Sequence, residues 1–136
     1  MPMNTDQDLR KLLRTASTIA MVGASNDPSR ESFGVMHYLM QAGYHVIPVN
    51  PKYDRVLGQR CFPDVRSIGE RVDIVDVFRR SDAVPGVVDD AIAAGAPAIW
   101  LQLGVVHPQA EQRAEQRGLA VVENRCIAIE HRRLMT

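Results

Sequence analysis

The chain contains a loop whose residue types suit the binding of a phosphate. An apolar run over residues 19–22 is too short for a helix, and Gly23-Ala24-Ser25 follows it directly. Phe33-Gly34 opens a helical pattern eight residues later. A buried strand that leads through a glycine loop into a helix lets backbone N–H groups approach a phosphate. A nucleotide-like ligand is therefore the first hypothesis.

The loop matches the dinucleotide fingerprint G-x-G-x-x-G only in its first glycine. Ser25 stands where the backbone would come closest to a pyrophosphate, and residues 29–32 lengthen the turn. A plain turn between a strand and a helix is the alternative interpretation.

The end of the next apolar run says more about the ligand. The run closes with Val49-Asn50-Pro51-Lys52, and Asn50 lies 27 positions after Gly23. An NAD site places an acidic residue about 20 positions after the glycines, where it binds the ribose 2′-OH. Here the first acid is Asp54, beyond the proline, and Lys52 is basic. The pattern favours a ribose that carries a phosphate, with a solvated loop lysine as the alternative role of Lys52.

Composition restricts the class of protein. The chain has 136 residues, of which 46% are hydrophobic, and this suits one domain over residues 1–136. Its 16 basic and 16 acidic residues leave no net field to attract nucleic acid or an anionic membrane. The first 14 residues do not resemble a signal peptide, and no apolar window is long enough for a membrane span. We therefore expect a cytoplasmic protein.

No constellation of catalytic or metal-binding residues stands out. The two cysteines, Cys61 and Cys126, form no C-x-x-C motif, so we expect reduced thiols and neither a disulfide framework nor a zinc site. Ser25 lacks the G-x-S-x-G setting of a nucleophile. The histidines have no metal-binding spacing, and we expect surface or packing roles for all of them. They are His37, His45, His107 and His131.

Short apolar runs alternate with helical patterns along the chain. A leading helix is predicted around Leu9–Leu13, because Thr5-Asp6-Gln7-Asp8 before it has a capping-box-like spacing and early acids that suit a helix start. Strands are predicted over residues 18–22, 45–49, 72–78, 98–103 and 119–122, and helices over residues 33–42, 83–94, 108–117 and 127–134. This alternation predicts a three-layer α/β domain whose five parallel strands fit the order 3-2-1-4-5. Residues 56–62 form an irregular connection.

In such a sheet, ligands bind beyond the carboxyl ends of the strands, at the point where crossovers reverse direction. The segments that follow the five strands are therefore the pocket candidates. They are Gly23-Ala24-Ser25, Asn50-Pro51-Lys52, Phe78-Arg79-Arg80, Gln102-Leu103-Gly104 and Glu123-Asn124-Arg125-Cys126.

Several blocks, in order, resemble a known family. They are the residues 19–25, 43–51, 76–79, 100–104 and 124–126. Together they look like the small stand-alone CoA-binding proteins over residues 15–133. That family is similar to the Rossmann-like CoA-binding domain at the start of the succinyl-CoA synthetase α subunit and of ADP-forming acyl-CoA synthetases.

The resemblance implies a ligand position. It implies that Gly23, Ala24, Ser25 and the Ser32-Phe33-Gly34 turn line the phosphate and pantetheine path. It places Lys52, after Asn50 and Pro51, near a CoA phosphate. It further implies that Val77, Phe78 and Arg79 border the adenine or ribose, and that Gln102 and Gly104 lie toward the pantetheine.

Cys126 is the residue with the most potential for chemistry. It begins a predicted helix beside Arg125, a setting that lowers a thiol pKa, so a mixed disulfide with CoA is one interpretation. A small residue that closes the pocket floor is the favoured one.

We therefore expect a stand-alone module that binds coenzyme A or an acyl-CoA without established catalysis. The chain has no room for the phosphohistidine domain of the synthetases, so ligase activity is not expected. Two alternatives stay open. One is an NADP-type enzyme, and the other is a protein-interaction module with a vestigial pocket.

Overall fold

A parallel sheet forms the centre of the protein. The computed structural model describes residues 5–135, so residues 1–4 and 136 of the predicted domain lie outside it. The sheet has five strands in the order β2-β1-β5-β6-β7, and every neighbouring pair is parallel. Their bounds are β1 Thr18–Val22, β2 His45–Val49, β5 Ile74–Val77, β6 Ala98–Leu101 and β7 Ala120–Val122. The predicted parallel α/β sheet is confirmed.

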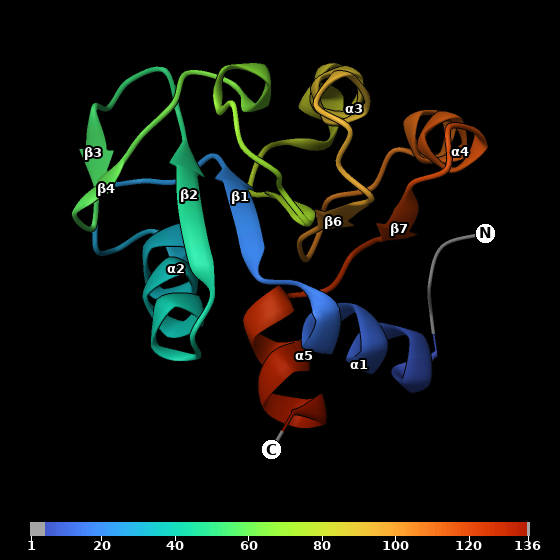
Figure 1. Ribbon diagram of the computed structural model, residues 1–136, viewed down its shortest axis with the longest axis horizontal. Helices are drawn as coiled ribbons and strands as arrows, with labels where there is room; N and C mark the ends of the chain where they lie inside the picture. Colours follow the sequence, from blue (N-terminus) through green and yellow to red (C-terminus); the bar gives the residue numbers. More distant parts are fainter. Residues whose placement is uncertain (1–4, 136) are drawn as a thin grey trace.

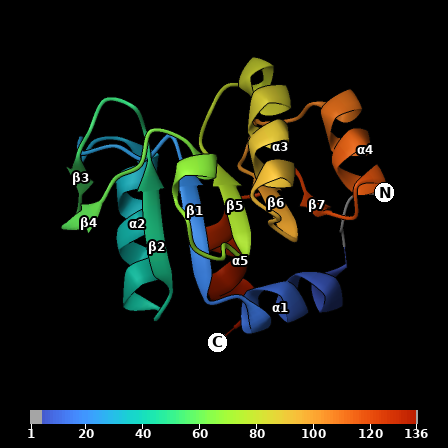
Figure 2. The same cartoon turned by 45° about the horizontal axis from the view of Figure 1, so that its top comes forward.

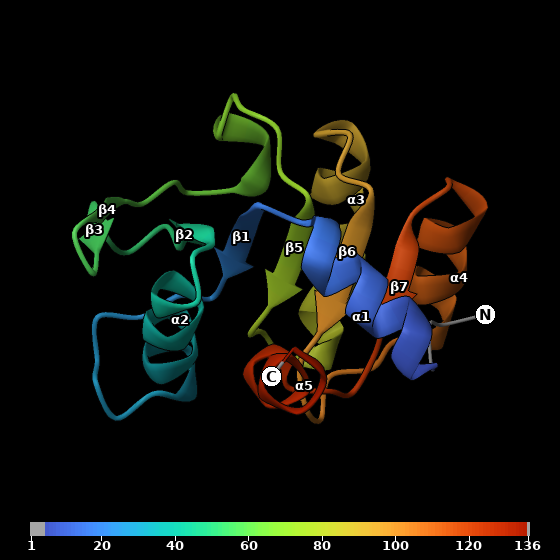
Figure 3. The same ribbon diagram turned by 60° about the horizontal axis from the view of Figure 1, so that its bottom comes forward.

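Helices cover both faces of this sheet and make three layers (Figures 1 and 3). The helices α1 (Asp6–Thr15), α2 (Glu31–Gln41) and α5 (Ile127–Leu134) pack on one face. The helices α3 (Val84–Ala93) and α4 (Pro108–Gln116) pack on the other. Alternate strand residues face the two layers: Ile19 and Met21 join the first core, whereas Ala20 and Val22 join the second. Both faces are apolar, as a sheet buried on two sides requires.

The strand order shows where the chain changes direction. Counted along the chain, the five paired strands stand in the order 2-1-3-4-5, because β5 returns beside β1 and not beyond β2. The place beyond β2 is taken by the segment at Phe62, which makes an isolated parallel bridge to Val49. When the Phe62 segment is counted as the third strand, the order from this edge of the sheet to β6 reads 3-2-1-4-5, as predicted. Without that segment, residues 72–78 are the third strand, and they lie beside β1 and not beyond β2.

Hydrogen bonds explain why the Phe62 segment occupies that edge. Its N–H donates to the Pro48 carbonyl at 3.0 Å, and its carbonyl accepts from the Asn50 N–H at 2.9 Å. These bonds satisfy backbone groups of β2 that would otherwise be exposed at the sheet edge. Just before it, a small hairpin of β3 (Arg55–Val56) and β4 (Gln59–Arg60) lies outside β2 (Figure 2).

Most element boundaries agree with the sequence patterns. The Thr5 hydroxyl caps α1 by accepting from the Asp8 N–H at 3.1 Å, and α5 has the predicted bounds. Two details differ. Helix α2 begins at Glu31, before the predicted residue 33, because Arg30 supplies its N-cap backbone. Ser81-Asp82, whose residue types suit a cap for the helix predicted from residue 83, instead lie in a short 3₁₀ turn, η2 (Ser81–Ala83), and the Ser81 hydroxyl accepts from the Val106 N–H at 3.1 Å.

Over residues 5–135, no helix has the length and apolar character that a membrane crossing requires.

Candidate functional site

A cleft of about 650 Å³ lies at the carboxyl ends of β2, β1 and β5. We call it the main cleft. Its walls come from the ends of these strands, from the 3₁₀ turn η1 (Val65–Ser67) with the residues before it, and from α3. A second hollow of about 600 Å³, the loop cleft, lies over the loop between β1 and α2. The two share Gly23, Asn50, Lys52 and Arg79, so they form one continuous depression around the end of β1.

Gly23 stands at the junction of the two clefts and permits the close approach of three strand ends. Its φ of +92° is unfavourable for side-chain-bearing residues. A Cβ atom here would lie 2.2 Å from the Phe78 carbonyl oxygen. The Gly23 N–H donates to the Val49 carbonyl at 2.9 Å. Gly23 therefore lets the ends of β1, β2 and β5 meet.

The Asn50 side chain connects two loops that border the cleft through hydrogen bonds. Its amide nitrogen donates to the Ala24 carbonyl at 2.8 Å, and its amide oxygen accepts from the Lys52 N–H at 2.9 Å. Asn50 thus uses its side chain to hold the glycine loop against the end of β2. This geometry gives Asn50 a positioning role and fixes the backbone from which the Lys52 side chain projects.

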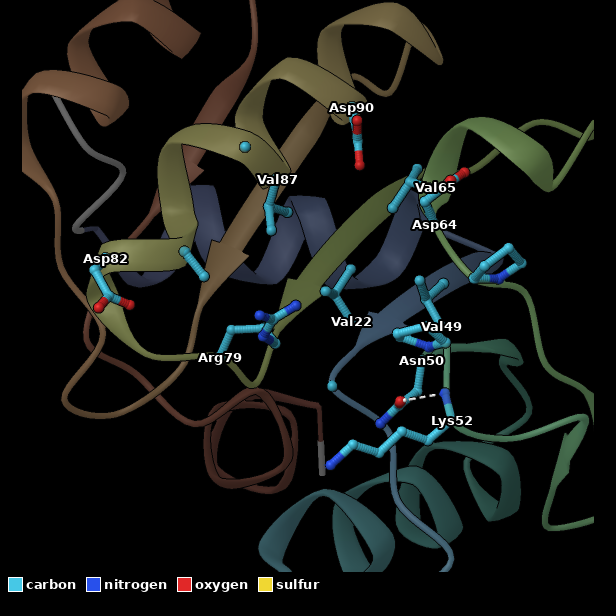
Figure 4. Close-up of a pocket in the computed structure, with 15 residues that line it drawn as sticks. Val22, Val49, Asn50, Lys52, Asp64, Val65, Arg79, Asp82, Val87 and Asp90 are labelled. Atoms are coloured by element: carbon cyan, nitrogen blue, oxygen red, sulfur yellow. Dashed lines mark hydrogen bonds between the residues drawn. The ribbon is translucent and has the colours of Figure 1, made fainter.

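Two cations reach toward the end of β1 from its neighbouring strands. Lys52 follows β2 and Arg79 follows β5, as Figure 4 shows. Among residues 5–135, neither charged group has a hydrogen-bond or ion-pair partner. Two carboxylates of the cleft are already engaged: Asp64 accepts from the Ser67 N–H at 2.9 Å, and Asp90 pairs with Arg66 at 2.7 Å. The unpartnered positive charges make this cleft suitable for an anion.

The comparisons with known proteins agree with this geometry. Residues 17–132 match the family model described as a CoA binding domain. The chain belongs to this family.

Its relatives include small proteins of the same length. The uncharacterised protein YneT of Bacillus subtilis is 37% identical over 124 residues, which cover 91% of this chain and 92% of YneT. A solved structure, a hypothetical protein from Pyrococcus horikoshii OT3, has a TM-score of 0.96 at 40% identity and covers 100% of this chain and 97% of that one. In Archaeoglobus fulgidus, the ADP-forming acetate–CoA ligase II is 28% identical over 113 residues, which cover 82% of this chain and 17% of the ligase. The CoA-binding domain is thus related to one part of a much longer ligase.

The loop cleft of this CoA-binding domain contains the N-terminus of α2. Arg30 caps α2 through its backbone alone, with no side-chain hydrogen bond to the first turn. Ser32 lies in that turn and is buried. The Ser25 hydroxyl accepts from the Asp27 N–H at 3.0 Å, which orders the loop that precedes the helix. The positive end of the α2 dipole and its uncapped N–H groups favour a negative ligand group here.

The structure does not bring all the predicted site residues into these clefts. The side chains of Ala24 and Val77 are buried in the two cores, so only their backbones can contact a ligand. Phe33 is half-buried and Gly34 is exposed on α2, directly after the cleft-lining Ser32, and neither lines the cleft. Pro51 lines the main cleft and Phe78 lines the loop cleft.

Three predicted residues lie farther along the same sheet edge. Gln102 is buried, and its side-chain oxygen accepts from the Ile127 N–H at 3.1 Å, which caps α5. The Gly104 N–H donates to the Asn124 side chain at 2.7 Å. Cys126 lines a third cleft, of about 490 Å³, beyond the ends of β6 and β7. Arg125, which the sequence placed beside this thiol, pairs instead with Glu130 at 3.2 Å.

Several lining residues were not singled out in the sequence. Arg30 and Tyr53 line the loop cleft, and Asp64, Gly86 and Asp90 line the main cleft. Arg30 directly precedes α2, so its place before a helix in a glycine loop was an available signal. No sequence signal pointed to Asp64 or Asp90, because η1 and α3 meet over the strand ends only in the folded chain.

Two of the histidines have capping or packing roles in the CoA-binding domain, whereas His37 and His45 are exposed. His107 caps α4 by accepting from the Ala110 N–H at 3.2 Å. His131 lies 2.8 Å from the Tyr38 hydroxyl, and burial lowers its pKa. Over the described residues 5–135, no three His, Cys, Asp or Glu side chains gather as a metal site would require.

A buried carboxyl, that of Glu111, lies beside Glu123, which lines the third cleft. Glu111 of α4 is buried, and its carboxylate accepts from the His107 N–H at 2.8 Å. Burial raises the pKa of Glu111 to about 7; its hydrogen bond with Glu123 adds to this rise, whereas the His107 N–H opposes it. The pair therefore holds one proton more readily than two isolated carboxyls would.

Glu111→Gln should abolish part of the pH dependence of stability. Because the folded pKa is above the unfolded one, Glu111 costs stability as the pH rises from about 4.5 to about 7. We expect Glu111→Gln to raise the free energy of unfolding at pH 8, relative to the native chain, by about 1 to 3 kcal/mol. Urea unfolding at pH 4.5 and pH 8 checks this. The same difference between the two proteins at both pH values would contradict it.

Proposed function

We propose that this protein binds coenzyme A or an acyl-CoA at the carboxyl edge of its sheet, as a stand-alone binding module. The observation that carries the proposal is the pair of unpartnered cations, Lys52 and Arg79, at a glycine loop whose neighbouring strand ends without an acid. A CoA ligand carries both a pyrophosphate and a ribose 3′-phosphate, so two separate cationic groups suit it. Membership of the CoA-binding domain family supports the same ligand.

Within this proposal, each predicted segment has a role. The backbone of residues 23–25 and the N-terminus of α2, with Ser32, contact the pyrophosphate. Lys52 binds the ribose phosphate. Arg79 binds a phosphate or stacks on the adenine, and the half-buried Phe78 supports it. Asn50 and Pro51 hold the β2 end in position.

The pantetheine arm would then run over the next strand ends. It passes the exposed backbone at Gly104 toward Cys126, while the buried Gln102 supports this path by capping α5. Cys126 is a free cysteine that lines the third cleft. Reduction of the freshly purified protein, followed by native mass spectrometry, tests whether this thiol holds CoA as a mixed disulfide.

Lys52→Ala tests the ligand and its orientation together. A charge-assisted contact is worth about 1.5 to 3 kcal/mol, so we expect the variant to bind CoA about 10- to 150-fold more weakly. Its affinity for 3′-dephospho-CoA should change little, because that ligand lacks the phosphate. Isothermal titration calorimetry measures both. Lys11→Ala is the matched control, since Lys11 is an exposed lysine on α1, outside both clefts.

The outcomes separate the remaining interpretations. Equal losses for both ligands would remove the phosphate role of Lys52. Binding of NADPH with no binding of CoA would favour a dinucleotide enzyme. A ligand present at 100 times its Kd raises the free energy of unfolding by about 2.7 kcal/mol. If saturating concentrations of CoA do not raise the free energy of unfolding, the pocket is vestigial.

A further inference from the structure

The third cleft differs from the other two in the side chains that it exposes. Leu103, which follows β6, is 57% exposed, and Ile129 on α5 is 49% exposed. Both line the cleft. Exposed apolar side chains that line one cleft, unlike those scattered singly over a surface, mark a candidate site for an apolar group.

Hydrogen bonds hold the walls of this cleft in place. The Gly104 N–H donates to Asn124 at 2.7 Å, and the Trp100 ring N–H donates to the Arg125 carbonyl at 2.8 Å. The Arg125 N–H donates to the Leu101 carbonyl at 3.2 Å. The loop after β7 is therefore tied to β6 at several points, and the cleft is a preformed feature of the fold.

The charged groups that line the third cleft have partners within the fold. Glu130 is 7% exposed and accepts from Arg125 at 3.2 Å and from Arg133. Glu123 shares a hydrogen bond with Glu111. No cation on the cleft wall is left without a partner, in contrast to Lys52 and Arg79. The charged side chains of the cleft are thus already engaged within the fold, whereas Leu103 and Ile129 present exposed apolar surface beside carboxylates that would repel an anion.

The sheet places this cleft in line with the proposed CoA site. Strands β1, β5, β6 and β7 are consecutive, and all are parallel, so their carboxyl ends lie along one edge. Neighbouring strands lie about 4.8 Å apart, so about 14 Å separates the end of β1 from that of β7. An extended pantetheine arm spans a distance of this order, which brings the end of the ligand to Leu103.

We propose that the third cleft binds the uncharged, apolar acyl chain of an acyl-CoA. The inference rests on the proposed function, because it needs CoA in the neighbouring clefts. It assigns the ligand class: aliphatic acyl thioesters of several carbons bind more tightly than free CoA, and acyl groups that end in a carboxylate do not. Leu103 and Ile129 supply the contacts that make this distinction.

Calorimetry with CoA, hexanoyl-CoA and adipoyl-CoA tests the proposal. Hexanoyl and adipoyl have the same number of carbons, but adipoyl ends in a carboxylate. Each buried CH₂ contributes about fourfold in affinity, so we expect hexanoyl-CoA to bind at least about 10-fold more tightly than CoA. Adipoyl-CoA should show no such gain. Equal affinity of all three ligands would overturn the inference, whereas failure of all three to bind would overturn the proposed function itself.

The double variant Leu103→Ser/Ile129→Ser locates the acyl chain. The ratio of the CoA and hexanoyl-CoA Kd values should fall from about 10 or more to below about 3. Val106→Ser is the matched control, because Val106 is 39% exposed but does not line the cleft, and it should retain the ratio. A ratio that persists in the double variant, or that falls equally in Val106→Ser, would overturn the placement. Both variants alter exposed side chains, and thermal unfolding verifies that they fold.

Discussion

Gly23→Ala is expected to destabilise the protein by more than about 3 kcal/mol, the largest effect among the glycine-to-alanine changes within residues 5–135. Two costs add. The φ of +92° is strained for alanine, and the new Cβ would lie 2.2 Å from the Phe78 carbonyl oxygen and 2.9 Å from its carbon. These are backbone atoms of Phe78, the residue directly after β5, whose N–H donates to the Val22 carbonyl at 2.8 Å. The clash can be relieved only by separating the ends of β1 and β5.

Gly43→Ala separates the clash from the backbone strain. Gly43 has a similar φ of +102°, but a Cβ added there meets no atom within 4 Å. We expect Gly43→Ala to cost about 1 to 2 kcal/mol, which is the strain alone. Urea unfolding measures both variants. If Gly23→Ala costs no more than Gly43→Ala, the close approach at Phe78 does not constrain the site.

Asp76→Asn is expected to stabilise the protein at neutral and higher pH. Asp76 lies on the central strand β5, paired laterally with Met21 and Trp100, and it is fully buried. Neither of its carboxyl oxygens has a hydrogen-bond partner. Burial therefore raises the pKa of Asp76 well above its usual value of 3.8. The folded protein keeps the proton that the unfolded chain releases.

The sign of the pH effect follows from this shift. Below pH 3.8, both states are protonated and Asp76 adds no pH-dependent cost. As the pH rises above this value, only the unfolded state ionises, so stability falls until the folded pKa is reached. Asparagine has nearly the same volume and does not ionise. We therefore expect the free energy of unfolding of Asp76→Asn, relative to that of the native chain, to rise as the pH increases from 4 to 8.

Asp73 provides a control of opposite sign three residues earlier. Burial acts to raise the pKa of Asp73, but N–H groups of Ser17 and Thr18 donate to its carboxylate and lower the pKa to about 2. Asp73→Asn should therefore destabilise the protein at neutral pH, and less so as the pH falls toward 2. Chemical unfolding across this pH range checks both variants. A pH-independent difference between Asp76→Asn and the native chain would show that Asp76 does not hold its proton in the fold.

The elements themselves were predictable because local patterns encode them. The apolar runs that became β1 and β2 are short and bounded by glycine or proline, and Thr5 before an acidic turn identified the start of α1. Each of these features acts over a few residues. The same reasoning located the segments after the strands, because parallel strands place their carboxyl ends together.

The position of strand β5 in the sheet could not be predicted from local sequence patterns. Its residues were recognisable, but its place beside β1 depends on the Phe62 segment occupying the outer edge of β2. That choice is made by backbone hydrogen bonds between distant parts of the chain. Nothing in the composition of residues 72–78 specifies which side of the sheet they join.

The sequence by itself therefore determined the fold class, the glycine loop and the basic residue that follows the second strand. Only the tertiary structure decided which of these groups are engaged within the fold and which remain available to a ligand. Gln102 caps a helix, Asn50 holds the loops, and Ala24 and Val77 turn into the cores, whereas Lys52 and Arg79 are left without partners. The physical reason is that a side chain's role depends on the atoms it meets, and those atoms come from segments far away in the chain.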